Sequence, residues 1–198
     1  YWEVSGSGRS MTIELPFDKE MIARAKQKAS SLGYINNSIL KGAGNLAGYL
    51  GEEALAPYVG DEIVSNNRGL DKYNHDLLVQ TQHVIEETQR IEVKTKRRTV
   101  APRPNYDVSI AETSSHQRPD IYAFISLEFD RVTKAHPKQY YGLKKIWLCG
   151  FMPANEFWDR SELWEKGKID KTNNFKTHVN MYNLAVRDLY TNISEALV

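Results

Sequence analysis

In the stretch Arg90-Ile91-Glu92-Val93-Lys94-Thr95-Lys96, charged side chains alternate strictly with Ile, Val and Thr. A period of two is typical of a β-strand, in which successive side chains point to opposite faces. We therefore expect the β-branched residues to face the core and Glu92 and Lys94 to project together from the other face, about 7 Å apart. An acid and an amine would then stand side by side on one surface of a sheet.

Four other stretches have the apolar and aromatic content of strands. The first, Asp76-Leu77-Leu78-Val79, is expected to be the neighbour of the alternating strand. The others are Ile121 to Phe129, Lys145 to Phe151 and Lys176 to Leu184. The segment 96–119 contains three prolines and few apolar residues, so we expect a long functional loop there with at most one helical turn.

The chain before these strands has helical spacing. Apolar residues recur at helical intervals after Asp18 and stop at Gly33, which favours a helix with a cap at each end. A second helix is expected from Asn36-Asn37-Ser38 through Ala54, ending before Pro57. This helix contains four glycines, which are unfavourable in helices. Another segment is therefore expected to approach it closely.

A final helix is expected after Val186. Helices followed by strands predict a mixed α/β domain with one central sheet. The 198 residues, 41% of them hydrophobic, suffice for one sizeable core, so residues 11–198 are expected to form a single domain. The run Ser5-Gly6-Ser7-Gly8-Arg9-Ser10 directly before Met11 is typical of an appended linker, and residues 1–10 are set aside for that reason.

Composition excludes several classes of protein. The net charge of +1 gives no overall attraction for an acidic partner, so a nucleic-acid surface would have to be a local patch. The single cysteine, Cys149, cannot form an internal disulfide, and it is expected to be a small buried residue rather than a nucleophile. No run of about 18 apolar residues predicts a membrane span.

Two carboxylates on adjacent strands would suit a magnesium ion. A hairpin would bring the carboxylate of Asp76 beside Glu92, and Mg²⁺ is held through one or two carboxylates while phosphate oxygens and waters complete its octahedron. Lys94 would then orient a metal-bound water or help to deprotonate it. The same alternating pattern is also typical of a solvated sheet face, so the residues indicate a site only as a set.

Asp76 followed by Glu92-Val93-Lys94 resembles the PD-(D/E)xK motif of the restriction-endonuclease-like nuclease superfamily. Upstream, Gly51-Glu52-Glu53-Ala54-Leu55-Ala56-Pro57-Tyr58-Val59 is similar to the first helix of Holliday-junction resolvases and related small nucleases, in which a glutamate reaches the metal site. Later, Pro119-Asp120-Ile121-Tyr122-Ala123-Phe124 and Ile146-Trp147-Leu148-Cys149-Gly150-Phe151 resemble core strands of phage and restriction-type members.

This resemblance implies a restriction-endonuclease-like fold, with a mixed central sheet flanked by helices. It implies a Mg²⁺-dependent (or Mn²⁺-dependent) DNA endonuclease that hydrolyses phosphodiester bonds and leaves a 5′-phosphate. Asp76, Glu92 and the carbonyl of Val93 would bind the metal, Lys94 would position the attacking water, and Glu52 would complete the site. Small members commonly act as dimers, so a homodimer is expected, in the cytoplasm of a bacterial or phage-infected cell.

The match departs from the family pattern at one position, where His75 replaces the proline before the aspartate. The helix offers two adjacent glutamates, Glu52 and Glu53, which cannot face the sheet equally. Gly48 lies one turn before Glu52 and leaves space beside it, whereas Tyr49 lies one turn before Glu53. We therefore favour Glu52.

Positive charges follow the alternating strand without an intervening acid. Together with Lys94 they form a cluster that could neutralise phosphates on either side of a scissile bond; the candidates for DNA binding are Lys96, Arg97, Arg98 and Arg103, with Arg118 and His116 further on. Two alternatives remain open: an exonuclease that works with a partner, and a nucleic-acid-binding protein that keeps the fold without cutting. The complete acid, acid and lysine set argues against the second.

Overall fold

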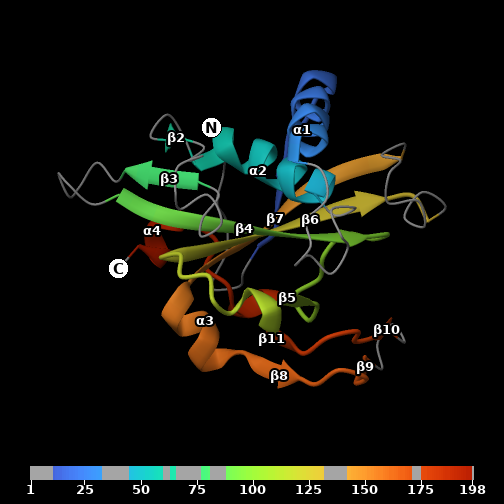
Figure 1. Ribbon diagram of the computed structural model, residues 1–198, viewed down its shortest axis with the longest axis vertical. Coiled ribbons are helices and arrows are strands. Elements are labelled where there is room, and N and C mark those ends of the chain that lie inside the picture. Colours follow the sequence, from blue (N-terminus) through green and yellow to red (C-terminus); the bar gives the residue numbers. More distant parts are fainter. Residues whose placement is uncertain are drawn as a thin grey trace.

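The computed structural model describes residues 11–32, 45–59, 63–65, 77–80, 88–131, 142–170 and 175–197. They form a mixed α/β structure in which a six-stranded sheet lies between a pair of helices and a second, smaller sheet (Figure 1). In chain order the elements are β1 Ile13–Leu15, α1 Lys19–Leu32, α2 Asn45–Val59, β2 Ile63–Ser65, β3 Leu77–Gln80, β4 Thr88–Arg98, β5 Asp107–Ala111, η1 Glu112–Ser114, β6 Ile121–Phe129, β7 Leu143–Pro153, α3 Ala154–Arg160, β8 Glu162–Trp164, β9 Ile169–Asp170, β10 Phe175–Lys176, β11 Met181–Ala185, η3 Val186–Asp188 and α4 Ile193–Ala196.

The central sheet has the strand order β1-β7-β6-β4-β3-β2. β4 runs parallel to β6, and the other neighbouring strands are antiparallel. The strands predicted at 76–79, 90–96, 121–129 and 145–151 are confirmed as β3, β4, β6 and β7. The sequence does not predict the edge strands β1 and β2, because three residues are too few to give an alternating pattern.

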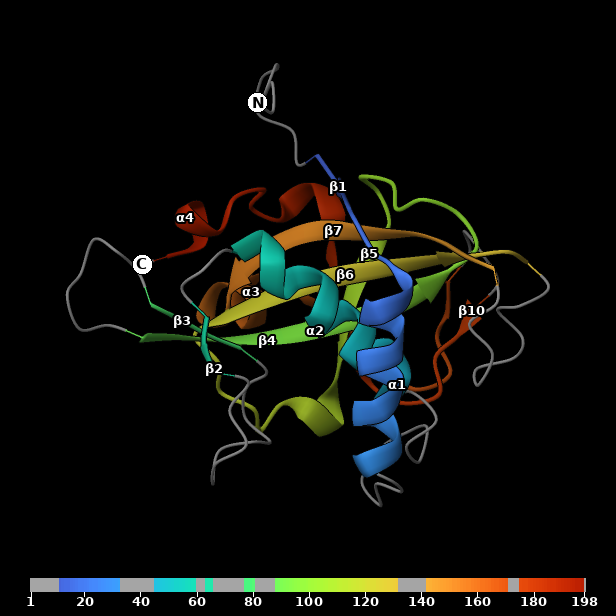
Figure 2. The same cartoon turned by 90° about the horizontal axis from the view of Figure 1, so that it is seen from above.

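Helices α1 and α2 cover one face of this sheet, as the view from above shows (Figure 2). The Oδ1 atom of Asp18 accepts a hydrogen bond from the backbone N–H of Met21 at 2.7 Å, so α1 begins at its predicted cap. Leu50 and Leu55 of α2 share one hydrophobic core with Ile91 and Val93 of β4. The β-branched face of the alternating strand is therefore the face that carries the helices.

Helix α2 approaches β4 as closely as its glycines predict. A Cβ atom on Gly51 would collide with Oγ1 of Thr95, so a larger residue has no room there. The predicted end before Pro57 is wrong, since the helix continues to Val59. The half-buried Val59 packs against the core, which favours continuing the helix despite the backbone donor that the proline removes.

The opposite face of the central sheet is covered by the sheet β5-β11-β8 and by α3 (Figure 1). Tyr122 and Phe124 of β6 contact Phe157 of α3 in a second hydrophobic core. The central sheet and the helical turn expected within 96–119, now η1, are confirmed, but smaller sheets are also present and the expected loop contains the strand β5. β5 pairs with β11, where Ser109 is opposite Asn183, 74 residues later.

Two further predictions concern the C-terminal part. The strand expected from Lys176 to Leu184 is divided into β10, which pairs with β9, and β11, which pairs with β5 and β8. The final helix is confirmed as the four-residue α4, preceded by the turn η3.

Cys149 is buried, as expected. None of the helices described is both long and apolar enough to cross a bilayer.

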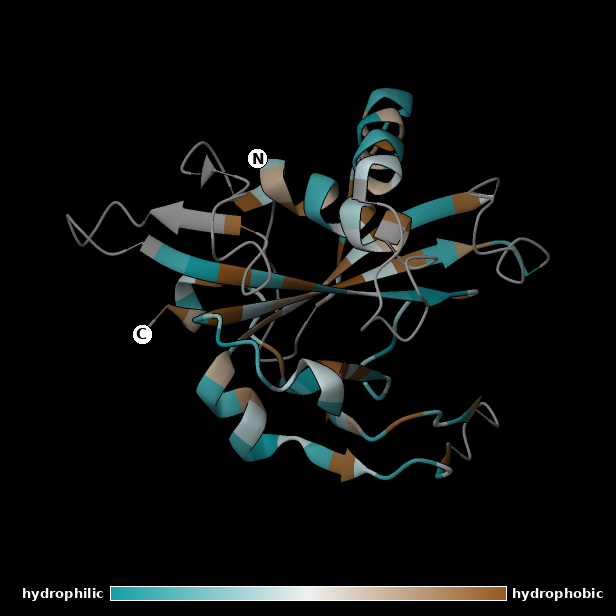
Figure 3. Cartoon of the chain, in the orientation of Figure 1, coloured by the Kyte–Doolittle hydropathy of each residue, from teal (hydrophilic) through white to brown (hydrophobic). Residues whose placement is uncertain are grey.

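Strand β4 lies between the helix layer and the second sheet. Hydrophobic and hydrophilic residues alternate along it (Figure 3), so its two faces differ in polarity. Ile91 and Val93 belong to the core beneath α2. Glu92, opposite Tyr122 in the parallel ladder, lies on the other face together with Lys94 and Lys96. A polar row therefore runs along β4 under the second sheet.

Candidate active site

Glu92 and Lys94 form an ion pair on the polar face of β4. The Nζ atom of Lys94 lies 2.7 Å from Oε1 of Glu92, as expected for residues two apart in a strand. The side chain of Glu92 is 7% exposed and that of Lys94 is 18% exposed. The pair is therefore largely removed from water, whereas the sequence suggested an open surface.

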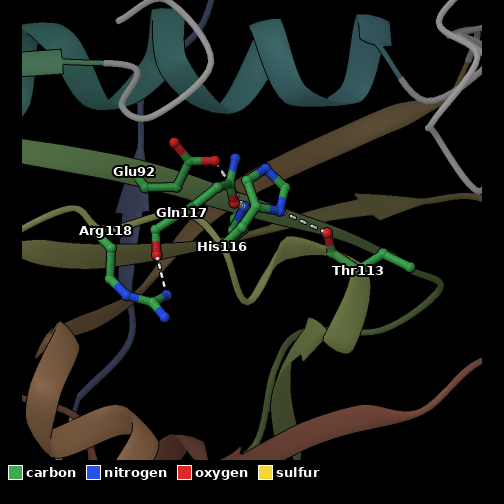
Figure 4. A network of polar contacts seen from close by, with 6 residues as sticks. Glu92, Thr113, His116, Gln117 and Arg118 are labelled. Carbon is green, nitrogen blue, oxygen red and sulfur yellow. Dashed lines mark hydrogen bonds and ion pairs between the residues drawn. The ribbon is translucent and has the colours of Figure 1, made fainter.

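Gln117 is the second partner of Lys94, and no pattern in the sequence predicts this contact. Its Oε1 atom accepts a hydrogen bond from Nζ of Lys94 at 2.6 Å (Figure 4). Gln117 follows η1 in the connection between β5 and β6, and its backbone N–H donates to the carbonyl of Ser114. A carboxylate and an amide thus hold the ammonium group from two sides.

Glu52 brings a second carboxylate to the neighbourhood of Glu92. Burial is the main cause that raises the pKa of Glu52 to about 7, and the negative charges of Glu92 and Glu53 raise it further, while the Lys28 charge acts in the opposite direction. The Glu92 contribution shows that the two carboxylates interact electrostatically. Helix α2, which carries Glu52, lies on the apolar face of β4, whereas Glu92 lies on the polar face. A ligand that contacts both Glu52 and Glu92 must therefore lie at the edge of β4.

Glu53, the alternative helix glutamate, is directed to α1 instead. Its carboxylate is 2.6 Å from Nζ of Lys28 and 2.8 Å from Nε of Arg24. Burial alone would raise the pKa of Glu53, but the hydrogen bonds from Lys28 and Arg24 outweigh it and lower the pKa. Glu53 therefore stays ionised in a salt bridge between helices, whereas Glu52 forms no ion pair within the described part of the chain.

Asp76 lies outside the described residues, so its side chain cannot be placed. It is the residue before Leu77, where β3 begins, and Leu77 is the partner of Ile91, the residue before Glu92. The described part of the β3 ladder therefore ends one residue short of Glu92. To contact a ligand bound by Glu92, Glu52 must extend from the helix layer to this edge of β4.

Within the described ranges, no three acidic, histidine or cysteine side chains gather closely enough to hold a metal ion. The two carboxylates that the structure relates are Glu52 and Glu92. Their hard oxygen atoms are the ligands that Mg²⁺ prefers, and a carboxyl group with a raised pKa is a group that a cation would stabilise in its charged form. These two carboxylates would need a third ligand from outside the described residues to form a metal site.

The predicted basic cluster does not form one exposed patch. Nζ of Lys96 lies 3.3 Å from the carbonyl oxygen of Asp107, and Nη2 of Arg98 donates to the same oxygen at 2.7 Å. Both side chains thus face the second sheet. Arg97 lies on the opposite face of β4, and Arg103 lies over the ring of Tyr106.

His116 and Arg118 are exposed beside Gln117. Nδ1 of His116 is 2.9 Å from the carbonyl oxygen of Thr113, and Arg118 donates to the carbonyl oxygens of Ser115 and Gln117 (Figure 4). These contacts stay within the turn that carries Gln117. Both residues are therefore at the surface next to the Glu92–Lys94 pair, as the sequence suggested.

Comparisons with protein-family models, with curated proteins and with solved structures give no match to this chain. Any function must be argued from its own residues and their geometry.

Proposed function

We propose that this chain is a Mg²⁺- or Mn²⁺-dependent deoxyribonuclease with a restriction-endonuclease-like active site. One observation carries the proposal: Lys94 is held beside the buried Glu92, and a second carboxylate with a raised pKa, that of Glu52, interacts with Glu92. An acid, a lysine and a helix glutamate in this arrangement are what the resemblance of the sequence implies.

The metal site is proposed at the edge of β4. Glu92 and Asp76 would be carboxylate ligands with the Val93 carbonyl, and Glu52 would complete the site through a second metal or a water. A divalent ion there would supply an activated water and would neutralise charge on the substrate phosphate. In its absence the mutual repulsion of Glu52 and Glu92 is part of what raises the pKa of Glu52.

Lys94 would hold the attacking water in line with the phosphodiester bond. Its ammonium group is already fixed by Glu92 and Gln117, so little conformational freedom is lost when the substrate binds. A lysine carries three donor hydrogens, so one remains for a water after these two contacts. This fixed ammonium group supports a positioning role rather than a simple surface charge.

DNA would approach from the exposed side of the same region. Arg97, Arg103 and Arg118 are the candidates for phosphate contacts at the surface, whereas Lys96 and Arg98 face the second sheet and donate to the Asp107 carbonyl oxygen. We propose an endonuclease that acts as a homodimer. An exonuclease that works with a partner protein has the same active site, and the choice of substrate distinguishes the two.

Digestion of several DNA substrates tests this proposal. Circular single-stranded DNA, linear duplex and a four-way junction would each be incubated with Mg²⁺, Mn²⁺ or EDTA. We expect cleavage with either ion, none with EDTA, and none by Lys94→Ala, while the control Lys145→Ala, at an exposed ion pair on β7, keeps full activity. Cleavage of circular DNA indicates an endonuclease, and cleavage of linear DNA alone indicates an exonuclease. Tight DNA binding without cleavage of any substrate would instead favour the non-cleaving alternative.

A further inference from the structure

A cavity of about 140 Å³ lies between the central sheet and the second sheet. Its volume is several times the roughly 30 Å³ that one water molecule occupies in the liquid. Lys96 and Arg98 of β4, Ser126 of β6 and Ser109 of β5 line it, together with apolar side chains. Lys94, the ion-pair partner of Glu92, also lines it, so the cavity adjoins the proposed active site.

Three cations line this cavity, and among the described residues only Lys94 forms an ion pair, with Glu92. Among the described residues, Lys96 Nζ contacts the carbonyl oxygen of Asp107 at 3.3 Å and Oγ of Ser109 at 3.2 Å. Arg98 donates from Nη2 to the Asp107 carbonyl and lies over the ring of Tyr106, 5.0 Å from its centroid. Neither Lys96 nor Arg98 forms an ion pair with any carboxylate in the described part of the chain. Their positive charge is therefore uncompensated by close contacts.

Two further donors at this cavity lack an acceptor. Ser126 is 1% exposed, and its Oγ atom has no hydrogen-bond partner among the described residues. The same is true of the buried Nε atom of Arg98. Ser126 of β6 is paired with Lys96 of β4 in the parallel ladder, so the two side chains lie on the same face of the sheet. Buried polar groups without partners are rare in proteins, and here they accompany two unpaired cations.

The negative charges of Asp107 and Asp170 offset the charges of Lys96 and Arg98 in part. The Cys149 thiol also lines the cavity, but burial raises its pKa to about 12, so the thiol is neutral at physiological pH. Loss of water around the ammonium group, with the Arg98 charge nearby, lowers the pKa of Lys96 to about 8. The lowered pKa of Lys96 is expected for a partly desolvated ammonium group near another positive charge, whereas burial raises the thiol pKa against the opposing effect of the two cations.

We propose that this cavity is a binding site for an oxyanion of the phosphate class, held by Lys96, Arg98 and Ser126. A tetrahedral oxyanion presents several acceptor oxygens with charge, which match a lysine, an arginine Nε–H and a hydroxyl. The anion is either free inorganic phosphate or a phosphate group of a nucleic acid. The site requires no metal ion, so it stands or falls independently of the nuclease proposal.

Calorimetric titration of the full chain with inorganic phosphate, in EDTA and a non-phosphate buffer at pH 7, tests the site. We expect saturable binding of one phosphate per chain, with Ser126→Ala weakening it at least about tenfold. Ser126→Ala should not lower the melting temperature of phosphate-free protein, because its hydroxyl has no partner to lose. The matched control is Ser161→Ala, which removes another buried hydroxyl without a partner, outside the cavity lining, and should leave phosphate affinity unchanged.

A second variant keeps the test decisive if Ser126→Ala is unstable. Lys96→Met removes the ammonium group and retains an aliphatic side chain, and it should also weaken phosphate binding at least about tenfold. Absence of phosphate binding by the wild type would overturn the proposal. So would binding that neither Ser126→Ala nor Lys96→Met weakens.

Competition with DNA identifies the source of the anion. A fluorescent single-stranded oligonucleotide would be bound to the wild type in EDTA and displaced with phosphate. Displacement that is lost in Ser126→Ala assigns the cavity to a phosphate group of nucleic acid. Phosphate binding without displacement assigns it to a free anion. Either result retains the site, because both require Ser126-dependent binding.

Discussion

Lys94 and Glu92 depend on each other because neither charge is well solvated. The sequence suggested that an exposed amine could be removed at little cost, but Lys94 is 18% exposed and pairs with a carboxylate that is 7% exposed. Removing one partner of a buried pair leaves the other charge uncompensated. The role of Lys94 in catalysis therefore has to be separated from its role in stability.

Lys94→Ala should lower the free energy of unfolding in metal-free buffer by roughly 2 to 3 kcal/mol, because it strands the Glu92 charge. Urea denaturation would measure this loss, and the double variant Glu92→Gln with Lys94→Ala should recover most of it. The matched control Lys145→Ala breaks an exposed pair with Glu14 and should cost less than about 1 kcal/mol. A double variant as unstable as Lys94→Ala alone would show that the ion pair is not the cause.

Glu52 makes stability depend on pH. Its pKa is about 7 in the folded protein and ordinary in the unfolded chain, so the folded state binds more protons between these two values. Stability should therefore fall as the pH rises from 5 to 8, with a Glu52 share of roughly 1 to 3 kcal/mol. Glu52→Gln should therefore lose less stability than the wild type between pH 5 and pH 8. It should also be more stable than the wild type at pH 8.

The neighbouring glutamate provides the control for this measurement. Glu53→Gln would break the ion pairs with Arg24 and Lys28, so it should be less stable than the wild type at pH 8. Denaturation curves at pH 5 and pH 8 give all the required values. If Glu52→Gln lost as much stability as the wild type between these pH values, Glu52 would not be the group that titrates.

At the scale of elements, the contact of α2 with β4 positions Glu52. A Cβ atom on Gly51 would collide with Thr95 Oγ1, whereas a Cβ atom on Gly48 would meet open space. Gly51→Ala should therefore destabilise the protein by roughly 1 to 3 kcal/mol through overpacking. Gly48→Ala should instead stabilise it by up to about 1 kcal/mol, because alanine is the better helix former.

Thermal or urea unfolding of the two glycine variants checks this pair of predictions. The comparison is internal, since both substitutions add one methyl group to the same helix. Equal stability changes for Gly51→Ala and Gly48→Ala would mean that α2 does not pack on Thr95 as described.

Elements with a strong local signal were predictable from the sequence. The strict alternation from Arg90 to Lys96 predicted β4, and the cap at Asp18 predicted the start of α1. The second sheet was not predictable, because its strands have three to five residues and pair across long separations in the chain. Local periodicity carries no information about such pairing.

Because the second sheet was not predictable, the parts of the candidate site that depend on it were not predictable either. The neighbours Glu92 and Lys94 followed from the strand period alone. Gln117 could not be found, because its contact with Lys94 depends on the path of the chain after β5. Nothing in the sequence indicated that Lys96, an exposed residue, and the half-buried Arg98 both donate to the Asp107 carbonyl oxygen of the second sheet.

For the whole molecule, a net charge of +1 means that DNA affinity must come from local contacts. Arg97→Ala should weaken DNA binding about equally for all sequences and lower the salt slope by about one. Arg98→Ala should also reduce stability, because Arg98 bonds the Asp107 carbonyl and lies over Tyr106. Fluorescence anisotropy over a range of salt concentrations measures DNA binding, and urea denaturation measures the stability of Arg98→Ala. An unchanged slope for Arg97→Ala would move the DNA groove toward His116 and Arg118.

The central claim is that a divalent cation binds between the carboxylates at the edge of β4, and calorimetric titration with Mg²⁺ or Mn²⁺ tests it most directly. Cleavage-resistant DNA would be present to supply phosphate oxygens. We predict binding to the wild type, loss of most of it in Glu92→Gln and Asp76→Asn, and a smaller effect in Glu52→Gln, whose carboxylate comes from the helix. Absence of divalent-ion binding to the wild type, even with DNA present, would contradict the nuclease proposal.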